Sequence, residues 1–465
     1  MTDPTTATTA RNYWEHTVRD DATALDEGAL RGPVSADVVV VGAGFTGLWA
    51  AIHLSELDPS SRIVIIEQAE VGHGASGRNG GFCSGDVTHG FANSLKHFPK
   101  EARELHDIGR DNLRRIVDFI RENNIDCDLQ VEGTTQLATS EFEAKELRDF
   151  SRQLADYGVA HTVAEPDDLN EVIRSSRWRA GITQGTEAAV MLNPLKLARG
   201  LARVARSRGV QIFRDTPALA LRETADGVQI DTPVGHVDAR QVIVATSAYS
   251  GWLPSLRKWF VPVYDYLMVS EPVDPKRLDA VGWRSLGGFI EASNQFHYFR
   301  RLPDNRLLWG GYDAVYYKGK VGSRFDHRPE IFEGLRARFA DTFPELADVD
   351  FPFQWGGAID TTTRFTVTFG HLPRRRGVFV LGYTGHGVGA THWAAEIAAR
   401  SLVDPGNEQL KLRMVRSRPI PFPPEPLRSI GIRVMQHELA KADRRGGRRG
   451  PILKLLDAMG IGFDS

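Results

Sequence analysis

The chain has 465 residues, enough for two or more domains of ordinary size. Its formal net charge of −2 gives no overall field that favours nucleic acid or a membrane surface. Its two cysteines, Cys83 and Cys127, are too few for a disulfide framework and lack a metal-ligand spacing, which fits a reducing compartment and no metal site.

Residues 1–35 predict a polar arm that Tyr13 and Trp14 could anchor. The first residues lack a basic stretch followed by an apolar one, so they do not resemble a secretory signal. The longest apolar runs of the chain have the length of strands, so we expect no membrane span. These features together favour a cytoplasmic protein whose partner is a small molecule.

The most informative segment is residues 36–67, where a buried strand, a glycine-rich turn, an apolar helix and a second buried strand follow one another. Gly42 permits the tight turn, Gly44 lets the backbone approach a pyrophosphate, and Gly47 lets the helix pack closely. Glu67 ends the second strand, where an acid accepts hydrogen bonds from a ribose diol and repels a 2′-phosphate. A strand–turn–helix that binds nothing is the alternative. The complete pattern favours FAD or NAD.

Two further glycine-rich turns, at residues 74–81 and 382–389, favour FAD over NAD. The first follows Glu67 and can run along the cofactor, with Ser76, Arg78 and Asn79 as donors to phosphate or ring carbonyls. The second precedes an alanine-rich helix, whose N-terminus would face N1 and the C2 carbonyl of a flavin. The alternatives are a flexible surface loop and a helix cap with nothing bound.

From these motifs we expect the cofactor to contact Gly42, Gly44, Phe45, Thr46, Gly47, Glu67, Gln68, Gly74, Ala75, Ser76, Arg78, Asn79, Gly80, Gly81, Ala245, Thr246, Trp252, Gly382, Thr384, Gly385, His386, Gly387, Val388 and Gly389.

Dinucleotide-type segments occur early, in the middle and late in the chain, and residues 260–315 between them alternate apolar and polar side chains as antiparallel strands do. The sequence therefore predicts an α/β fold in which a Rossmann-like FAD-binding domain is interleaved with a mainly antiparallel-sheet substrate domain, the two sharing a cleft. The expected boundaries are an FAD-binding domain of residues 36–95, 187–255 and 352–418, a substrate domain of residues 96–186 and 256–351, and a basic C-terminal extension of residues 419–465.

The motifs at residues 42–67, 74–81, 245–250 and 382–392 together resemble those of the D-amino-acid-oxidase-like FAD oxidoreductases, and most of all the γ-glutamylputrescine oxidase branch. The resemblance covers residues 12–405, approximately. It implies hydride transfer from the carbon that bears an amine to flavin N5, giving an imine that hydrolyses to an aldehyde. It also implies O2 as the electron acceptor, with H2O2 as product.

Departures from the family pattern narrow these expectations. Residues 355–363 contain no cysteine where sarcosine-oxidase relatives attach the flavin, so we expect non-covalent FAD. Residues 307–313 contain no lysine where sarcosine oxidase promotes the reaction with O2, which leaves oxidase and dehydrogenase activity both open. The positions that hold a substrate carboxylate in amino-acid-oxidising relatives match Ile359 or Asp360 and Val388 or Gly389 here. The missing cation favours an amine over an α-amino acid.

The candidate catalytic and substrate-binding residues are Asp360, His386, Tyr264, Tyr266, His297 and Tyr298, with Met268 and Phe299 as further walls of the cleft. Asp360 would suit an ammonium group, or would serve as a turn residue or an acceptor for N–H groups. Aromatic side chains alternating along a strand are also typical of a core, and His386 lies beside the flavin or makes a structural hydrogen bond.

The leading hypothesis is an FAD-dependent amine oxidoreductase acting on a small or polyamine-derived amine. One alternative is a glycine, D-amino acid or sarcosine-type oxidase or dehydrogenase whose carboxylate cation comes from outside the expected segments, for instance Arg300 or Arg301. The other is a non-catalytic flavoprotein module. The extension has basic residues clustered at 444–449, which favours a solvated docking helix over a site for an acidic partner or phosphate.

Overall fold

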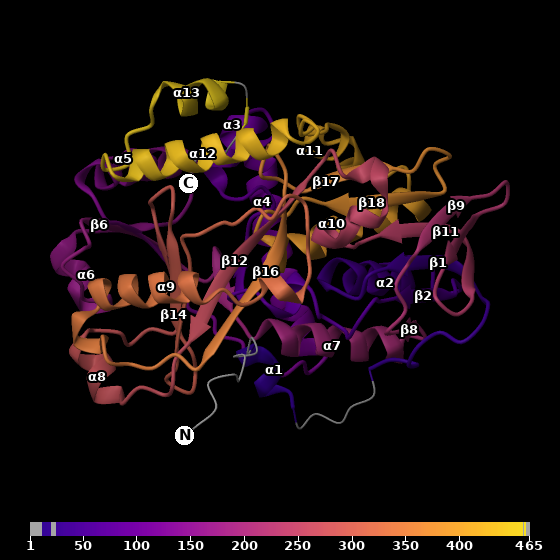
Figure 1. The fold of residues 1–465 in the computed structure, drawn as a ribbon, viewed down its shortest axis with the longest axis horizontal. Coiled ribbons are helices and arrows are strands. Elements are labelled where there is room, and N and C mark those ends of the chain that lie inside the picture. The colour runs from indigo at the N-terminus through magenta and orange to yellow at the C-terminus, as the bar shows by residue number, and fades with distance from the viewer. Residues whose placement is uncertain (1–11, 20–24, 459, 462–465) are drawn as a thin grey trace.

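The computed structural model describes residues 12–19, 25–458, 460 and 461. Two large sheets lie side by side, each in its own half of the molecule (Figure 1). The C-terminal helices α12 (Leu427–Asp443) and α13 (Pro451–Ala458) lie above the half that contains β12 (Val261–Val269) and β14 (His297–Arg301). The α/β class expected from the sequence is confirmed.

The first sheet contains the glycine-rich turns and is mainly parallel. Its order is β17 (Thr368–His371), β18 (Gly377–Leu381), β11 (His236–Val244), β1 (Val34–Val41), β2 (Ile63–Ile66) and β8 (Gln211–Phe213). β9 (Ala220–Glu223) and β10 (Val228–Asp231) extend antiparallel from β11. In a parallel sheet of this kind, ligands bind beyond the carboxyl ends of the strands.

Helices α2 (Phe45–Leu57) and α10 (Gly387–Val403) pack against this sheet and against each other. Helix α7 (Pro194–Ser207) packs on α2, and α4 (Ala102–Glu122) packs on α10. Gly42 has φ +108° at the end of β1, a conformation that side chains rarely adopt. A Cβ atom on Gly47 would lie 1.8 Å from the carbonyl oxygen of Gly42. Both glycines are therefore required where β1 turns into α2.

The second sheet is antiparallel except where β4 runs parallel to β13. Its order is β16 (Phe353–Thr361), β12 (Val261–Val269), β15 (Leu307–Gly311), β14 (His297–Arg301), β13 (Gly288–Glu291), β4 (Thr134–Ala138), β6 (Ala180–Gln184) and β5 (Thr162–Ala164). Helix α9 (Pro329–Thr342) packs on β12 and β15 over an aromatic core that includes Trp309 and Phe339.

The remaining elements are α1 (Tyr13–Thr17), β3 (Phe82–Ser84), α3 (Phe91–His97), α5 (Glu141–Asp156), α6 (Pro166–Val172), β7 (Ala189–Met191), α8 (Pro275–Ala280), α11 (Arg413–Arg416), α12 (Leu427–Asp443), α13 (Pro451–Ala458) and six 3₁₀ turns, η1 (Ala75–Gly77), η2 (Ser247–Trp252), η3 (Pro254–Leu256), η4 (Ser323–Phe325), η5 (Pro344–Leu346) and η6 (Glu408–Lys411). Among the described residues, no helix is both long enough and apolar enough to cross a bilayer.

Two segments predicted from the sequence, residues 352–361 and the N-terminal arm, have defined positions in the structure. Residues 352–361 were expected in the FAD-binding domain, but β16 pairs with β12 along its whole length, so this segment belongs to the second sheet. In the predicted arm, Tyr13 and Trp14 are buried against the body of the protein, whereas residues 1–11 and 20–24 lie outside the described part.

We predict that Gly47→Ala lowers the free energy of unfolding by about 3 kcal/mol, because the new methyl group must displace the backbone of the turn. Thermal denaturation and the flavin content of the purified protein measure the effect. Gly185→Ala is the control, since a Cβ there meets nothing within 4 Å. Equal stability of the two variants would contradict the close approach of α2 to β1.

Candidate active site

A cavity of about 700 Å³ lies between the two sheets. It runs from Glu67 at the end of β2, past the first turn of α2 and the loop of residues 74–80, to the turn before α10. It then continues along β12 and β14 and ends beneath α12 and α13. Its size and its position between two domains are typical of a cofactor or substrate site.

At one end of the cavity, the carboxylate of Glu67 is held in a fixed orientation. It accepts hydrogen bonds from the backbone N–H of Ala43 at 2.8 Å and of Ala69 at 3.0 Å. Burial raises its pKa, and these N–H groups act in the opposite direction. A carboxylate has more acceptor positions than these two bonds use, so Glu67 can still accept from a ribose hydroxyl.

The loop of residues 74–81 uses the side chains that were expected to donate to the cofactor for its own shape. The Asn79 amide donates to the carbonyls of Ala75 and Ser76, and the Ser76 hydroxyl accepts the N–H of Phe45 at 2.9 Å. Arg78 donates to Asp326 at 2.8 Å and to the carbonyl of Gly356 at 3.1 Å. Arg78 therefore ties this loop to the second sheet, although all three side chains also line the cavity.

Most of the expected cofactor residues line the cavity, and four do not. The four are Gly47, Gly81, Gly382 and Gly389. Each lies against the protein itself: a Cβ on Gly389, for example, would be 2.1 Å from the carbonyl oxygen of Ser84. These glycines allow close packing of the protein around the cavity. The expectation that they contact the cofactor is therefore replaced by a supporting role in the cavity wall.

Asp360 braces the third glycine-rich turn. Its carboxylate, 2% exposed, accepts the N–H of Gly382 at 2.5 Å and of Tyr383 at 3.3 Å. Burial raises its pKa to about 6, although the bond from Gly382 acts against this. The carboxylate therefore acts as an N–H acceptor, and it also lines the cavity.

His386 lies at the start of α10 with its Nδ1 3.4 Å from the carboxylate of Asp86. The ring of His89 lies against it, with 3.9 Å between centroids and the ring planes tilted by 34°. Burial, and then the neighbouring His386, lower the pKa of His89 to about 3. Burial alone would raise the pKa of Asp86, but the neighbouring His386 holds it below its usual range. Asp86 and His89 were missed because they lie in a loop without a motif.

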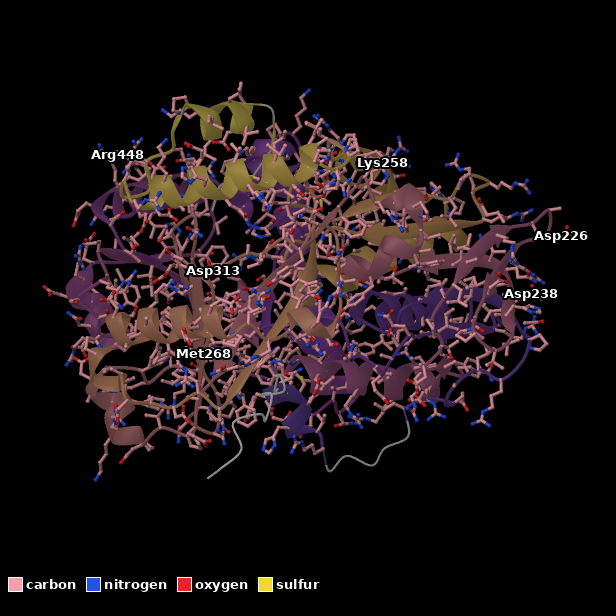
Figure 2. All side chains as sticks on the ribbon, viewed as in Figure 1. Asp226, Asp238, Lys258, Met268, Asp313 and Arg448 are labelled. Carbon is pink, nitrogen blue, oxygen red and sulfur yellow. The ribbon has the colours of Figure 1, made fainter. Side chains whose placement is uncertain are left out.

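Strand β12 presents the opposite face to the cavity from the one expected. Val263, Asp265 and Leu267 line the cavity, whereas Tyr264 and Tyr266 point into the aromatic core beneath α9. Met268 (labelled in Figure 2) and Phe299 also lie in that core, and both are fully buried. The expectation that these four side chains line the cleft is corrected: they are core residues.

The residue on this wall that the sequence did not indicate is Asp265. Its carboxylate accepts a hydrogen bond of 2.5 Å from the hydroxyl of Tyr298, which does line the cavity. Burial raises the pKa of Asp265 to about 6, with the bond from Tyr298 acting against this. Gly357 lies opposite Asp265 in the neighbouring strand and also borders the cavity.

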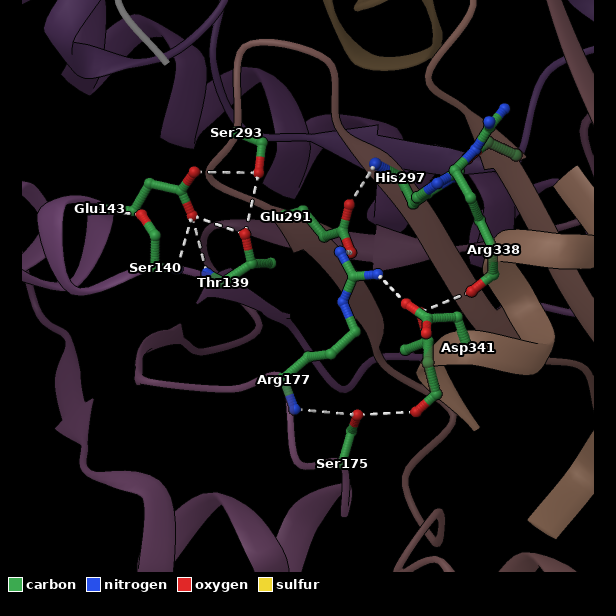
Figure 3. A network of polar contacts seen from close by, with 12 residues as sticks. Thr139, Ser140, Glu143, Ser175, Arg177, Glu291, Ser293, His297, Arg338 and Asp341 are labelled. Atoms are coloured by element: carbon green, nitrogen blue, oxygen red, sulfur yellow. Dashed lines mark hydrogen bonds and ion pairs between the residues drawn. The ribbon is translucent and has the colours of Figure 1, made fainter. Parts of the chain in front are cut away.

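His297 is not among the residues that line the cavity. It belongs to the network of polar contacts drawn in Figure 3. Its backbone N–H donates to buried Glu291 at 2.9 Å, and its ring stacks on Trp309. Burial raises the pKa of Glu291 to about 7 and lowers that of His297 to about 3, so the imidazole is neutral. The expected catalytic role of His297 is corrected to a structural one.

The same network holds the hairpin of residues 292–296, three of which line the cavity. The carboxylate of Glu143 accepts from Ser293 at 3.1 Å and from the backbone of Thr139 at 2.7 Å. Arg177 lies 3.8 Å from Glu291 and pairs with Asp341 at 3.0 Å. This part of the cavity wall is therefore fixed from behind by buried polar contacts.

Among the described residues that line the cavity, the cations are Arg78 and Arg449, and both have partners. The two arginines of the amino acid alternative lie elsewhere: Arg300 donates to the carbonyls of Gly80 and Leu192, and Arg301 donates to Asn305.

These residues fit FAD. Glu67 lies where a ribose diol would be, α2 and α10 direct their N-termini into the cavity, and a carboxylate-lined wall faces the far end. A two-domain fold of this kind, with one dinucleotide site and an adjoining substrate wall, defines a flavin-dependent oxidoreductase.

Comparison with known proteins gives the same class. The family model for FAD-dependent oxidoreductases (DAO) matches residues 37–401, and the chain belongs to this family. It is 29% identical over 378 residues to a probable oxidoreductase OrdL of Haemophilus influenzae, covering 79% of this chain and 83% of that protein. It is also 29% identical over 391 residues to the gamma-glutamylputrescine oxidoreductase of Escherichia coli, covering 80% and 85%.

Among solved structures, glycine oxidase from Geobacillus kaustophilus superposes with a TM-score of 0.68 at 20% identity, covering 83% of this chain and 99% of that one. The expected family, the expected FAD cofactor and the expectation of an enzyme are confirmed.

We predict that Asp360→Asn weakens FAD binding about tenfold and lowers the melting temperature, because an amide oxygen replaces a carboxylate that accepts two N–H groups. Titration of the apoprotein with FAD measures the first effect. Asp226→Asn, at an exposed turn, is the control. A large rise in the KM for amines with unchanged FAD affinity would instead assign Asp360 to the substrate.

Proposed function

We propose that this enzyme oxidises the carbon–nitrogen bond of an amine that carries no carboxylate on the reacting carbon, such as a polyamine-derived amine. The observation that supports this most is Asp265, a carboxylate in the cavity wall that is hydrogen-bonded to Tyr298. Within the described chain, no ion pair joins Asp265 to a cation, so a cationic substrate would supply the missing partner. The likeness to gamma-glutamylputrescine oxidoreductase supports the same substrate class.

FAD held by Glu67 and by the N-termini of α2 and α10 would supply the acceptor for a hydride from the carbon that bears the nitrogen. The chain supplies binding and proton transfer. Asp265 pairs with the substrate ammonium and then accepts one of its protons, which leaves a neutral amine able to give up hydride. Tyr298 holds the carboxylate in place. Water then hydrolyses the resulting imine to an aldehyde, and we propose O2 as the final acceptor, giving H2O2.

An amino acid substrate is the second candidate, and Arg449 is the observation in its favour. Arg449 lines the cavity and pairs with both carboxylate oxygens of Asp457, at 2.9 and 2.8 Å. To hold a substrate carboxylate, Arg449 would have to exchange this bidentate partner.

The first experiment is an anaerobic titration of the purified holoenzyme, following loss of the oxidised flavin absorbance. We expect hexylamine and N-acetylputrescine to bleach the flavin, and glycine, sarcosine and D-alanine to leave it oxidised. Bleaching by the amino acids alone would favour the second candidate, and bleaching by none of these compounds would favour a non-catalytic flavoprotein.

We predict that Asp265→Asn lowers kcat/KM for amines about 100-fold, because the substrate ammonium loses its buried counter-charge. In the native enzyme, kcat/KM should rise with pH through about 6, where Asp265 ionises. This limb should disappear in Asp265→Asn.

Tyr298→Phe is the matched variant. It removes a hydrogen bond that favours the ionised carboxylate, so the pKa of Asp265 rises and the limb moves to higher pH. Stopped-flow flavin reduction across the pH range measures both effects. An unchanged pH profile in both variants would exclude Asp265 as the group that binds the amine.

A further inference from the structure

The C-terminal segment of residues 420–458 lies outside the part of the chain that the family model matches, yet it forms one wall of the cavity. We call this segment the cap. Its helix α12 runs across the top of the molecule above β12 and β16, and α13 lies on α12 (Figure 1). The sequence predicted a solvated docking helix here, whereas residues of α12 and α13 line the cavity.

The side of α12 that faces the cavity is mostly apolar. Ile432, Met435, Gln436 and Leu439 follow the i, i+3, i+4, i+7 spacing of one helix face, and all four line the cavity. Leu453 and Leu456 of α13 line it as well. By contrast, Leu427, Ile430 and Val434 share the opposite, exposed face of α12.

Polar contacts hold the cap to the cavity rim. The carboxylate of Asp443 accepts from the backbone and the amide of Asn294, at 3.1 and 2.7 Å, and from the backbone of Gln295 at 2.8 Å. The Gln436 amide donates to the carbonyl of Ala314. The cap is thereby fixed to the two loops of the second sheet that border the cavity.

The charged groups of the cap that reach the cavity are already compensated. Arg449 pairs with Asp457 and also donates to Asn294 at 3.3 Å. Asp457 in addition accepts from Lys96 of α3 at 3.1 Å. What the cap offers a ligand is therefore mainly hydrocarbon.

We propose that the cap closes an apolar subsite that binds the hydrocarbon part of the amine substrate and excludes a second charge. This inference rests on the proposed amine oxidation. Each methylene that enters the subsite should strengthen binding about fourfold. Asp313, on the loop that Gln436 contacts, also lines the cavity but is already paired with Arg338 at 3.2 Å. A second ammonium group would therefore lose its hydration without gaining an unpaired counter-charge, which disfavours free diamines relative to monoamines of the same length.

The test compares hexylamine with 1,6-diaminohexane, which differ only in the second ammonium group. With the native holoenzyme, kcat/KM for anaerobic flavin reduction should be at least about tenfold higher for hexylamine. Met435→Glu places an acid on the inner face and should abolish or reverse this preference. Val434→Glu places the same acid on the outer face, where the native side chain is 42% exposed, and should leave the preference unchanged.

A binding measurement separates this inference from the proposed reaction. Hexyltrimethylammonium and tetramethylammonium cannot be oxidised at nitrogen, and their Kd values follow from the perturbed absorbance of the oxidised flavin. The native protein should bind the hexyl compound more than about tenfold more tightly, and Met435→Glu should change that ratio while Val434→Glu does not.

Equal Kd values for the two cations, or equal effects of the two variants, would overturn the apolar subsite even if amines reduce the flavin. Selective binding of the hexyl compound without flavin reduction by any amine would retain the subsite and overturn the proposed reaction. Melting temperatures of both variants check that the cap remains folded.

Discussion

The carboxylate of Asp360 joins the two sheets where both border the cavity. It lies near the end of β16 in the second sheet and accepts backbone N–H groups from the turn that follows β18 in the first. Arg78 makes the reciprocal connection, from a loop of the first domain to Asp326 and Gly356 of the second. A cofactor held by one sheet and a substrate held by the other can react only if these connections fix the position of one sheet relative to the other.

The cofactor half of the site could be predicted because its chemistry constrains the backbone. A turn that packs a helix on a strand and exposes N–H groups to a phosphate has no room for Cβ atoms, so glycine must recur at fixed spacing. The acid at Glu67, at the end of the second strand, could be predicted because a ribose diol needs a hydrogen-bond acceptor there. Sequence could not show which glycines contact a ligand: Gly47 and Gly389 are needed because the protein's own backbone lies against them.

The substrate half of the site was harder to predict, because both faces of β12 are apolar or aromatic except at Asp265. One face packs on the core beneath α9 and the other borders the cavity. The alternation along Tyr264, Asp265 and Tyr266 therefore does not show which side chains face the cavity. The acid itself is the signal that would have identified the cavity-facing side, since a carboxylate in an otherwise apolar strand needs a partner. The positions of Arg300 and the cap depend on contacts between distant segments, which no local pattern records.

The order of strands in the first sheet has a consequence for how the protein is made. β1 lies between β2, which follows it closely, and β11, whose paired residues are about two hundred positions later in the chain; β18 then pairs on the far side of β11. A ribosome must therefore release most of the polypeptide before the nucleotide-binding sheet can assemble. Such non-local pairing folds slowly and leaves apolar strands exposed in the meantime, so this enzyme should depend on chaperones more than a protein of equal length with local topology.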